Sequence, residues 1–388
     1  MSPFPMVEIT EGHTRLVVPK ASIKSPAPPT TPVFFNPAAS TNRDVSVAVV
    51  QASSGLTFCD SMTGVGGRGV RVANEVARKM HVTMIDMNSQ SLRLAKRNAK
   101  LNGVSGKSEF VHSEANSFFY PAQAREDRFD FIDLDPFGTP APYIQPMLTA
   151  VADTGIASIT ATDTAVLCGI HPDVARRRYG STPLNNEFNH ETAIRVLVNA
   201  VRRQGAAIDL GIQPVAVHST RHYVRVFVRV LVGATKADKA AEGEGYVIVC
   251  QKCDERSASR MPLLVCPRCG SKAKCAGPLW TGSLTEPALV KTAATTAERF
   301  GFRTAAKILA SLANVDHFPP WGYSLERICS TLGIPTVPVQ GVAGFLRDSG
   351  FRCGPQPFEL LGVKTDADHA DVVRAVKSAS RRRNRHGN

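Results

Sequence analysis

The chain has 388 residues, of which 43% are apolar and 20% charged, so two or three domains are possible and a wholly disordered protein is excluded. Its 46 lysines and arginines against 33 acidic residues give a formal charge of +13, which favours an anionic partner such as nucleic acid or an acidic membrane surface, although a basic but inert surface is equally compatible. We expect a cytoplasmic protein with reduced cysteines, because no run reaches the roughly 18 apolar residues of a membrane helix and the first residues lack the pattern of a secretory signal.

Residues 1–45 are rich in proline and small polar residues, which predicts a leader or a loop wrapped on the core. From residue 46 to about 235, short apolar runs alternate with helical patterns. The predicted strands are 56–60, 82–86, 108–112, 129–134 and 155–162, and the predicted helices are 69–79, 89–102 and 192–205. Runs 208–218 and 223–232 resemble an antiparallel hairpin that closes the sheet. This alternation indicates an α/β domain with a mostly parallel, Rossmann-like sheet covered on both faces.

The pattern changes after residues 236–245, which are small and charged and are typical of a linker. Residues 246–280 hold a cysteine cluster, 284–315 have helical patterns, and a helix–turn–helix pattern over 324–349 precedes short strand-like runs. This order is compatible with a winged-helix type module. Residues 370–388 carry six basic residues against one acidic residue, a tail for which contact with phosphates and plain solubility both remain open. We therefore predict an added C-terminal α+β domain over 246–388.

A glycine-rich turn that includes Gly64 follows the first predicted strand, which ends in Asp60. The next strand ends in Asp86, about 20 residues after the glycines, where a carboxylate can accept both hydroxyls of a ribose. Glu114 and Ala115 follow the third strand and could meet an adenine edge. Three acidic strand ends suit a cationic cofactor without phosphate, S-adenosylmethionine, better than a pyrophosphate. A structural turn, and a solvated loop acid at position 114, are the alternatives.

The fourth strand runs into Asp135-Pro136-Phe137-Gly138, at the edge of an open sheet where ligands bind. The Asp135 carboxylate can accept a hydrogen bond from the exocyclic amine of a base, and later its proton. The carbonyl of Pro136 can accept the second N–H, and Phe137 offers a face on which a base can stack. Because aspartate, proline and glycine all form turns, a plain turn is the alternative. The preceding glycine turn and Asp86 favour the catalytic interpretation.

Four cysteines form two Cys-x-x-Cys pairs, Cys250 with Cys253 and Cys266 with Cys269, separated by 12 residues. Two such knuckles supply the four thiolates of a tetrahedral zinc site. With four protein ligands no position is left for water, so the predicted zinc is structural and helps to fold a segment with little core of its own. A redox pair or unligated thiols are the alternatives.

Several strings together resemble the tRNA (guanine-26-N2)-dimethyltransferases, in order over roughly residues 11–280. They are DLDPFG at 133–138 with TATDTAVLCG at 160–169, VFFNP at 33–37, NRD at 42–44 and DLGI at 209–212. The resemblance implies a class I methyltransferase fold with an added C-terminal domain that binds tRNA. It also implies transfer of one and then two methyl groups from S-adenosylmethionine to the exocyclic N2 of guanine 26.

The resemblance also implies roles for individual residues. Asp135 would be the catalytic carboxylate, and Phe34 and Phe137 would sandwich the guanine. The cofactor would be lined by Arg43, Arg68, Asp86, Glu114 and Ala115. Three residues separate Gly64 from Arg68 where the family usually has one, and position 114 is glutamate where the family often has aspartate. Without the resemblance, Phe34 would be a hydrophobic anchor and Arg43 part of a surface salt bridge.

Three rival functions remain at this point. The enzyme could methylate guanine N2 at another RNA position, or stop at one methyl group. The chain could be a non-catalytic zinc-ribbon RNA-binding protein, which the intact Asp135-Pro136-Phe137 string disfavours. A nicotinamide-dependent oxidoreductase would explain neither that string nor the basic charge. We expect tRNA as the partner, no membrane association, and no protein partner is evident.

Overall fold

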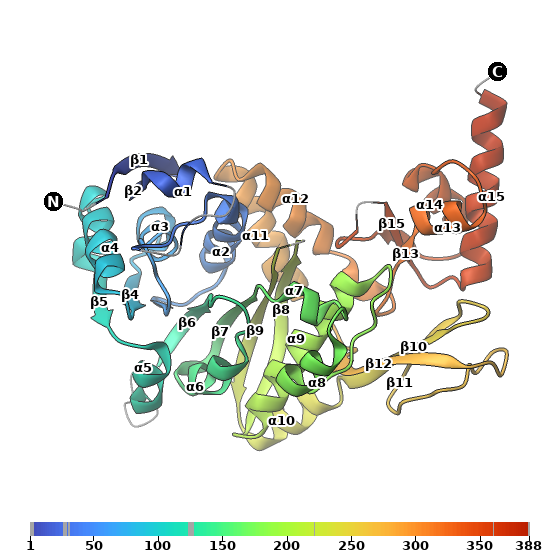
Figure 1. The fold of residues 1–388 in the computed structure, drawn as a ribbon, viewed down its shortest axis with the longest axis horizontal. Coiled ribbons are helices and arrows are strands. Elements are labelled where there is room, and N and C mark those ends of the chain that lie inside the picture. Colours follow the sequence, from blue (N-terminus) through green and yellow to red (C-terminus); the bar gives the residue numbers. More distant parts are fainter. Residues whose placement is uncertain are drawn as a thin grey trace.

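A seven-stranded sheet forms the centre of the molecule (Figure 1). The computed structural model describes residues 4–25, 29, 32–122, 128–220, 222–359 and 361–386. The strands of the sheet are β3 (Thr57–Asp60), β4 (His81–Asp86), β5 (Ser108–His112), β6 (Phe129–Leu134), β7 (Val151–Ala161), β8 (Leu210–Ser219) and β9 (Val224–Val232). Their order is β5-β4-β3-β6-β7-β9-β8, in which the first five are parallel and β9 and β8 form an antiparallel pair at one edge. The predicted Rossmann-like sheet with a closing hairpin is confirmed.

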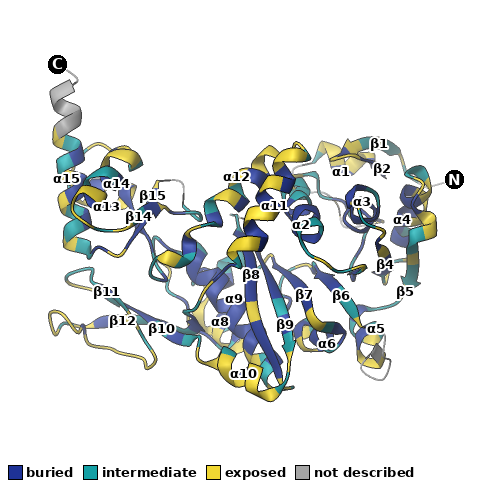
Figure 2. Ribbon diagram, turned by 180° about the vertical axis from the view of Figure 1, so that it is seen from behind, coloured by how far each residue is buried: buried dark blue, intermediate teal, exposed yellow. Residues whose placement is uncertain are grey.

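Helices cover both faces of this sheet (Figures 1 and 2). One layer contains α2 (Ser40–Ala52), α3 (Gly69–Glu75), α4 (Ser89–Leu101), α11 (Pro287–Arg299) and α12 (Arg303–Leu312). The other contains α5 (Ala115–Ala122), α6 (Ile144–Thr149), α7 (Thr164–Leu167), α8 (Pro172–Tyr179), α9 (Asn189–Ala206) and α10 (Ala234–Ala241). In α9 the buried Ile194, Leu197, Val198 and Val201 recur at helical spacing, so one face of the helix packs on the sheet.

The N-terminal segment is more ordered than the leader expected from its composition. It forms a hairpin of β1 (Met6–Glu11) and β2 (Thr14–Pro19), followed by α1 (Lys20–Lys24). Leu16 and Val18 of β2 are buried in the main core, and Asn98 of α4 accepts a hydrogen bond from the Val17 N–H at 2.7 Å. The apolar side chains of β2 therefore bind the segment to the body. Residues 26–28 of the predicted leader lie outside the described residues.

The chain beyond β9 differs from the predicted linker and separate domain in two places. Residues 234–241 form the helix α10 where a linker was expected. A small three-stranded sheet follows, made of β10 (Glu244–Cys250), β11 (Arg256–Ser259) and β12 (Ala273–Trp280). After it the chain returns to the body, where α11 packs on α2. Leu289, Val290 and Ala293 of α11 belong to the main hydrophobic core.

A second hydrophobic core lies in the last 65 or so residues, which we call the terminal module (residues 323–386). Its elements are β13 (Tyr323–Ser324), α13 (Leu325–Thr331), α14 (Val339–Asp348), β14 (Cys353–Pro355), β15 (Gly362–Thr365) and α15 (His369–His386). Two helices followed by a small antiparallel sheet agree with the predicted winged-helix pattern. The side chains of Arg382, Arg383 and Arg385, predicted as part of the basic tail, lie outside the described residues.

Short 3-10 helices complete the chain: η1 (Pro37–Ala39), η2 (Ser105–Lys107), η3 (Ala141–Tyr143) and η4 (Val315–His317). Among the described residues, no helix combines the length and the apolar character needed to cross a bilayer.

Candidate active site and zinc centre

A cavity of about 760 Å³ opens at the carboxyl ends of the parallel strands. All of the residues predicted for base and cofactor binding line it: Phe34, Arg43, Asp60, Gly64, Arg68, Asp86, Glu114, Ala115, Asp135, Pro136 and Phe137. They converge because the ends of neighbouring parallel strands meet at one edge of the sheet, which is where open α/β sheets bind ligands. The volume lies within the usual range of small-molecule sites, about 300–1,000 Å³.

The glycine loop begins directly after β3 and is held by Asp60. One oxygen of the buried Asp60 carboxylate accepts hydrogen bonds from the Gly69 N–H and the Thr63 hydroxyl, both at 2.8 Å. Burial, together with the nearby Asp133 charge, raises the pKa of Asp60 to about 7. Gly66 has φ +82°, and a Cβ there would lie 2.9 Å from Val70 and 3.1 Å from Ala95. The loop geometry therefore requires glycine, and the observed contacts of Asp60 support the loop.

Asp86 ends β4 and faces the cavity beyond the glycine loop. Its carboxylate accepts the N–H of Gly64 at 2.8 Å and that of Asn88 at 2.7 Å. Burial raises the pKa of Asp86, which these backbone hydrogen bonds partly oppose. Glu114 accepts the Ser117 N–H at 2.9 Å at the start of α5, where Ala115 is buried against the cavity.

The charges on the cavity wall suit a cationic ligand. Among the described lining residues there are four carboxylates, Asp60, Asp86, Glu114 and Asp135, against two guanidinium groups, Arg43 and Arg68. Because S-adenosylmethionine carries a sulfonium and an ammonium group and has no phosphate, these residues fit that cofactor. Cofactor contact of each individual residue remains a prediction.

Phe34 and Phe137 meet at the cavity although about 100 residues separate them. Their ring centroids lie 4.7 Å apart with an interplanar angle of 83°, an edge-to-face contact. Phe137 is 66% exposed. The hydrophobic anchors of this segment are the neighbouring Val33 and Phe35, which are buried, whereas Phe34 lies on the cavity wall. Both rings therefore lie at the cavity, where they contact each other in this structure.

Arg43 takes part in a buried ion cluster. Its guanidinium donates to both oxygens of Glu11, each at 2.5 Å, and to the Asn36 carbonyl at 3.0 Å. Arg71 also contacts Glu11, at 2.9 Å, and Asp44, at 2.7 Å. Burial raises the pKa of Glu11, but Arg43 and Arg71 outweigh this effect and lower it. The salt bridge considered for Arg43 is thus present, although it is buried and ties β1 to α2 and α3.

Asp135 lies against a second cluster, which sequence reasoning missed. Arg68, predicted as a cofactor residue, contacts Asp135 Oδ2 at 2.5 Å and Asp133 Oδ2 at 2.8 Å. Arg225 of β9 is fully buried and also contacts Asp133. Two signals could have identified these residues: Asp133 precedes Asp135 by one strand repeat, and Arg225 is one of two arginines, with Arg229, in a strand whose other residues are all apolar.

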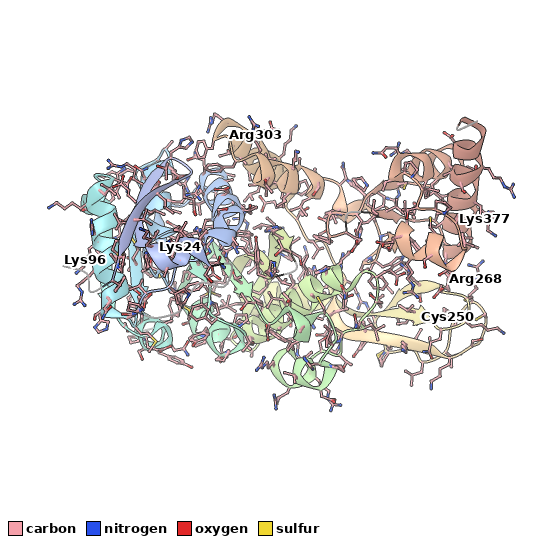
Figure 3. The ribbon with its side chains drawn as sticks, turned by 45° about the horizontal axis from the view of Figure 1, so that its top comes forward. Lys24, Lys96, Cys250, Arg268, Arg303 and Lys377 are labelled. Atoms are coloured by element: carbon pink, nitrogen blue, oxygen red, sulfur yellow. The ribbon has the colours of Figure 1, made fainter. Side chains whose placement is uncertain are left out.

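The four predicted zinc ligands come together at the end of β10. Their sulfur atoms all lie within 4.8 Å of one another, with Cys250–Cys269 at 3.6 Å and Cys253–Cys266 at 3.8 Å. A tetrahedral site with zinc–sulfur bonds of about 2.3 Å has sulfur–sulfur edges of about 3.8 Å, so the four thiols fit a structural zinc ion. Arg268, within the second knuckle, pairs with Asp368 at 2.8 Å and so joins this lobe to the start of α15 (Figure 3).

Comparisons with known proteins identify the family of this chain. The family model described as N2,N2-dimethylguanosine tRNA methyltransferase matches residues 12–377. The tRNA (guanine(26)-N(2))-dimethyltransferase of Methanosarcina acetivorans is 34% identical, with 96% of this chain and 98% of that protein covered. The Methanopyrus kandleri protein of the same name is 35% identical, with coverage of 92% and 93%.

The structure of Trm1 from Pyrococcus horikoshii in complex with S-adenosyl-L-methionine superposes with a TM-score of 0.82 at 30% identity, covering 95% of this chain and 99% of that one. The fold and the family expected from the sequence are thereby confirmed. The chain belongs to the N2,N2-dimethylguanosine tRNA methyltransferase family.

Proposed function

We propose that this protein transfers one and then two methyl groups to the exocyclic N2 of guanine 26 in tRNA, with S-adenosylmethionine as the donor. The observation that carries the proposal is the Asp135 carboxylate in a cavity shared with the Phe34–Phe137 pair and the glycine loop. The names of the relatives support the substrate and the position.

The target base must leave its neighbours to reach Asp135, so we propose that it is extruded into the cavity. Phe34 and Phe137, which contact each other edge to face in this structure, would then separate and hold the guanine between their rings. Stacking of a base on an aromatic side chain contributes about 1–3 kcal/mol, which offsets part of the cost of unstacking.

The cofactor would lie over the glycine loop, with Asp86 on its ribose and Glu114 and Ala115 near its adenine. S-adenosylmethionine supplies a methyl group on a positively charged sulfur. The lone pair of guanine N2 is delocalised into the ring, so this amine is a poor nucleophile. Asp135 accepts a hydrogen bond from N2 and takes its proton as the methyl group arrives, which keeps the developing positive charge on nitrogen small.

The same residues can serve the second methylation. N2-methylguanine still carries one N–H on N2, and Asp135 can accept it in the same way after the cofactor is exchanged and the Asp135 proton is released. We propose that the Pro136 carbonyl accepts the other N–H in the first round. In the second round N2 has no second N–H for this carbonyl to accept.

We propose that the region from 246 to 388 holds the body of the tRNA, while residues 46–235, together with Phe34 of the N-terminal segment, carry the chemistry. Cys250, Cys253, Cys266 and Cys269 would bind the zinc ion that folds the β10–β12 lobe. Figure 3 shows Arg268 on this lobe and Lys377 on α15 at the same end of the molecule. Basic side chains here suit tRNA phosphates. We propose the cytoplasm as the compartment, because it holds tRNA and keeps the thiols of zinc ligands reduced.

The test is methyl transfer from labelled S-adenosylmethionine to an unmodified tRNA transcript, read by mass spectrometry of nucleosides and by mapping of the modified position. Asp135→Ala should lower kcat by about 10²–10⁴-fold, the usual contribution of general base catalysis. Asp153→Asn is a matched control, because this exposed carboxylate lies at the opposite end of β7 and accepts the Val232 N–H.

Activity of Asp135→Ala near that of the wild type would refute the catalytic role. A product at another position would indicate an N2-guanine methyltransferase for that position. A monomethyl product alone would indicate an enzyme that stops after one methyl group. Binding of tRNA without affinity for the cofactor would indicate a non-catalytic RNA-binding protein.

A further inference from the structure

A row of buried polar residues crosses one face of the central sheet at the base of the cavity, where two of its members, Asp60 and Thr160, also line the cavity wall. In the strand register Asp60 pairs with Asp133, and Asp133 pairs with Ser158. Thr160, two residues further along β7, pairs with Arg225 of β9. Paired residues and residues two apart on a strand share one face. Side chains from β3, β6, β7 and β9 therefore form one continuous polar row, and all five are at most 2% exposed.

Arg225 closes this row from the β9 side. Its guanidinium donates to the Thr160 and Ser158 hydroxyls, both at 2.5 Å, and to Asp133. Its Nη1 lies 4.0 Å from Asp135 Oδ2. Arg225 has no exposed surface and is not part of the cavity wall. It therefore cannot touch a substrate, and any effect on the reaction must pass through its neighbours.

Arg68 approaches the same carboxylates from the start of α3. It contacts Asp135 Oδ2 at 2.5 Å and Asp133 Oδ2 at 2.8 Å. It is itself held by Asn42 at 2.9 Å and Ser46 at 2.5 Å. Both arginines thus approach Asp135 at Oδ2, which leaves Oδ1 as the oxygen for the guanine amine.

Opposite charges also meet around Asp135. The two guanidinium groups face Asp133 and Asp135, Asp133 is fully buried between the arginines, and Asp60 lies beside Asp133 as a third carboxylate, itself buried. A buried charge is tolerated only when it is paired and hydrogen-bonded. Asp133 therefore compensates one positive charge, and the second attracts Asp135.

We propose that Arg225 and Arg68, with Asp133 as their shared counter-ion, are positioning residues that fix the Asp135 carboxylate for both methyl transfers. This inference rests on the proposed function. The second transfer depends more strongly on the orientation of Asp135, because N2-methylguanine presents a single N–H whereas guanine presents two. A loosened carboxylate should therefore favour the monomethyl product.

The experiment compares Arg225→Gln and Arg225→Lys with the wild type on unmodified tRNA. Arg229→Gln is the matched control, because Arg229 lies on the same strand but pairs with Glu286 at 2.6 Å and with the Thr154 carbonyl, outside the cavity wall. The readouts are kcat, the KM for tRNA, the Kd for S-adenosylmethionine, the ratio of dimethyl to monomethyl product and the thermal midpoint.

For Arg225→Gln we expect a fall in kcat of about tenfold or more, since small misplacements of a catalytic group have effects of this size. The tRNA KM and the cofactor Kd should stay within about twofold, and monomethylguanosine should accumulate. Arg225→Lys should recover part of kcat and of the dimethyl share, because it keeps the charge. Arg229→Gln should lower neither kcat nor the share of dimethyl product.

The proposal is overturned if Arg225→Gln has the same kcat and product ratio as Arg229→Gln. It is also overturned if the fall in kcat of Arg225→Gln is fully explained by a larger unfolded fraction or by weaker binding of S-adenosylmethionine. If Arg225→Gln does not fold, Ser158→Ala removes one acceptor of the guanidinium outside the cavity wall and should shift the product ratio in the same direction. An unchanged ratio in Ser158→Ala would then count against the proposal. Failure of the wild type to methylate guanine N2 would instead refute the proposed function.

Discussion

Glu191 of α9 joins the main body to the terminal module through a fully buried network. Both of its carboxylate oxygens accept hydrogen bonds from Lys364 of β15 at 2.7 Å. Arg195, one helical turn along α9, donates to Glu191 at 2.9 and 3.1 Å, and Gln356 of the terminal module donates at 3.2 Å. The Glu191 carboxylate thus balances the charges of two buried cations, Arg195 of the main body and Lys364 of the terminal module.

The two sides of this network should differ in their effect on stability. Glu191→Leu leaves Lys364 and Arg195 without their shared counter-ion, and removing one partner of a buried ion pair costs about 3–5 kcal/mol. Lys364→Met leaves the Glu191–Arg195 pair intact and removes hydrogen bonds to a charged group, which contribute about 1.5–3 kcal/mol. We therefore expect Glu191→Leu to be the more destabilising substitution.

The assay is urea unfolding at neutral pH, followed by far-UV circular dichroism and by the fluorescence of Trp280 and Trp321. Trp280 packs in the main core, and Trp321 also contacts the core of the terminal module. Equal losses for the two variants, or a larger loss for Lys364→Met, would refute the counter-ion argument.

The pH dependence supplies a second check on the same carboxylate. Burial raises the pKa of Glu191, but Lys364 and Arg195 outweigh burial and lower it below its ordinary value of 4.5. The folded state therefore binds this proton less readily than the unfolded state, so the contribution to stability is present above pH 4.5 and is lost as the pH falls further. The gap in stability between the wild type and Glu191→Leu should narrow below that pH, and a constant gap would contradict the assignment.

Two further predictions concern the zinc centre and the base-binding ring. Cys266→Ser, or treatment with a chelator, should abolish bound zinc, as measured by elemental analysis, and should unfold the β10–β12 lobe. Cofactor binding should persist, because the lobe lies apart from the cavity. The control Cys275→Ser should keep its zinc, since Cys275 is outside the four-thiol cluster. Phe137→Ala should lower kcat/KM for tRNA by roughly 5- to 150-fold, because it removes a stacking contact of about 1–3 kcal/mol. The Kd of S-adenosylmethionine, measured by calorimetry, should stay unchanged. An unchanged kcat/KM would exclude this ring from base binding.

The sequence by itself determined the parts of the protein that depend on local patterns. Alternating apolar runs and helical periodicity predicted the strands and helices of the sheet, because burial against two helical layers demands those patterns. The Cys-x-x-Cys pairs predicted the thiol cluster, since two knuckles at this spacing converge. The meeting of Asp60, Asp86, Glu114 and Asp135 at the cavity was also predicted, because the ends of parallel strands lie at one edge, whereas Phe34, Arg43 and Arg68 were expected there only from the resemblance.

Only the tertiary structure decided which distant segments meet. The β1–β2 hairpin replaced a predicted leader, α10 replaced a predicted linker, and α11 returned to pack on α2. The approach of Arg225 to Asp133 across β7 likewise depends on strand register. These features come from long-range packing and from the compensation of buried charges, neither of which leaves a periodic pattern in the sequence. The same long-range contacts placed Arg68 against the Asp135 carboxylate, where the resemblance alone implied a cofactor residue.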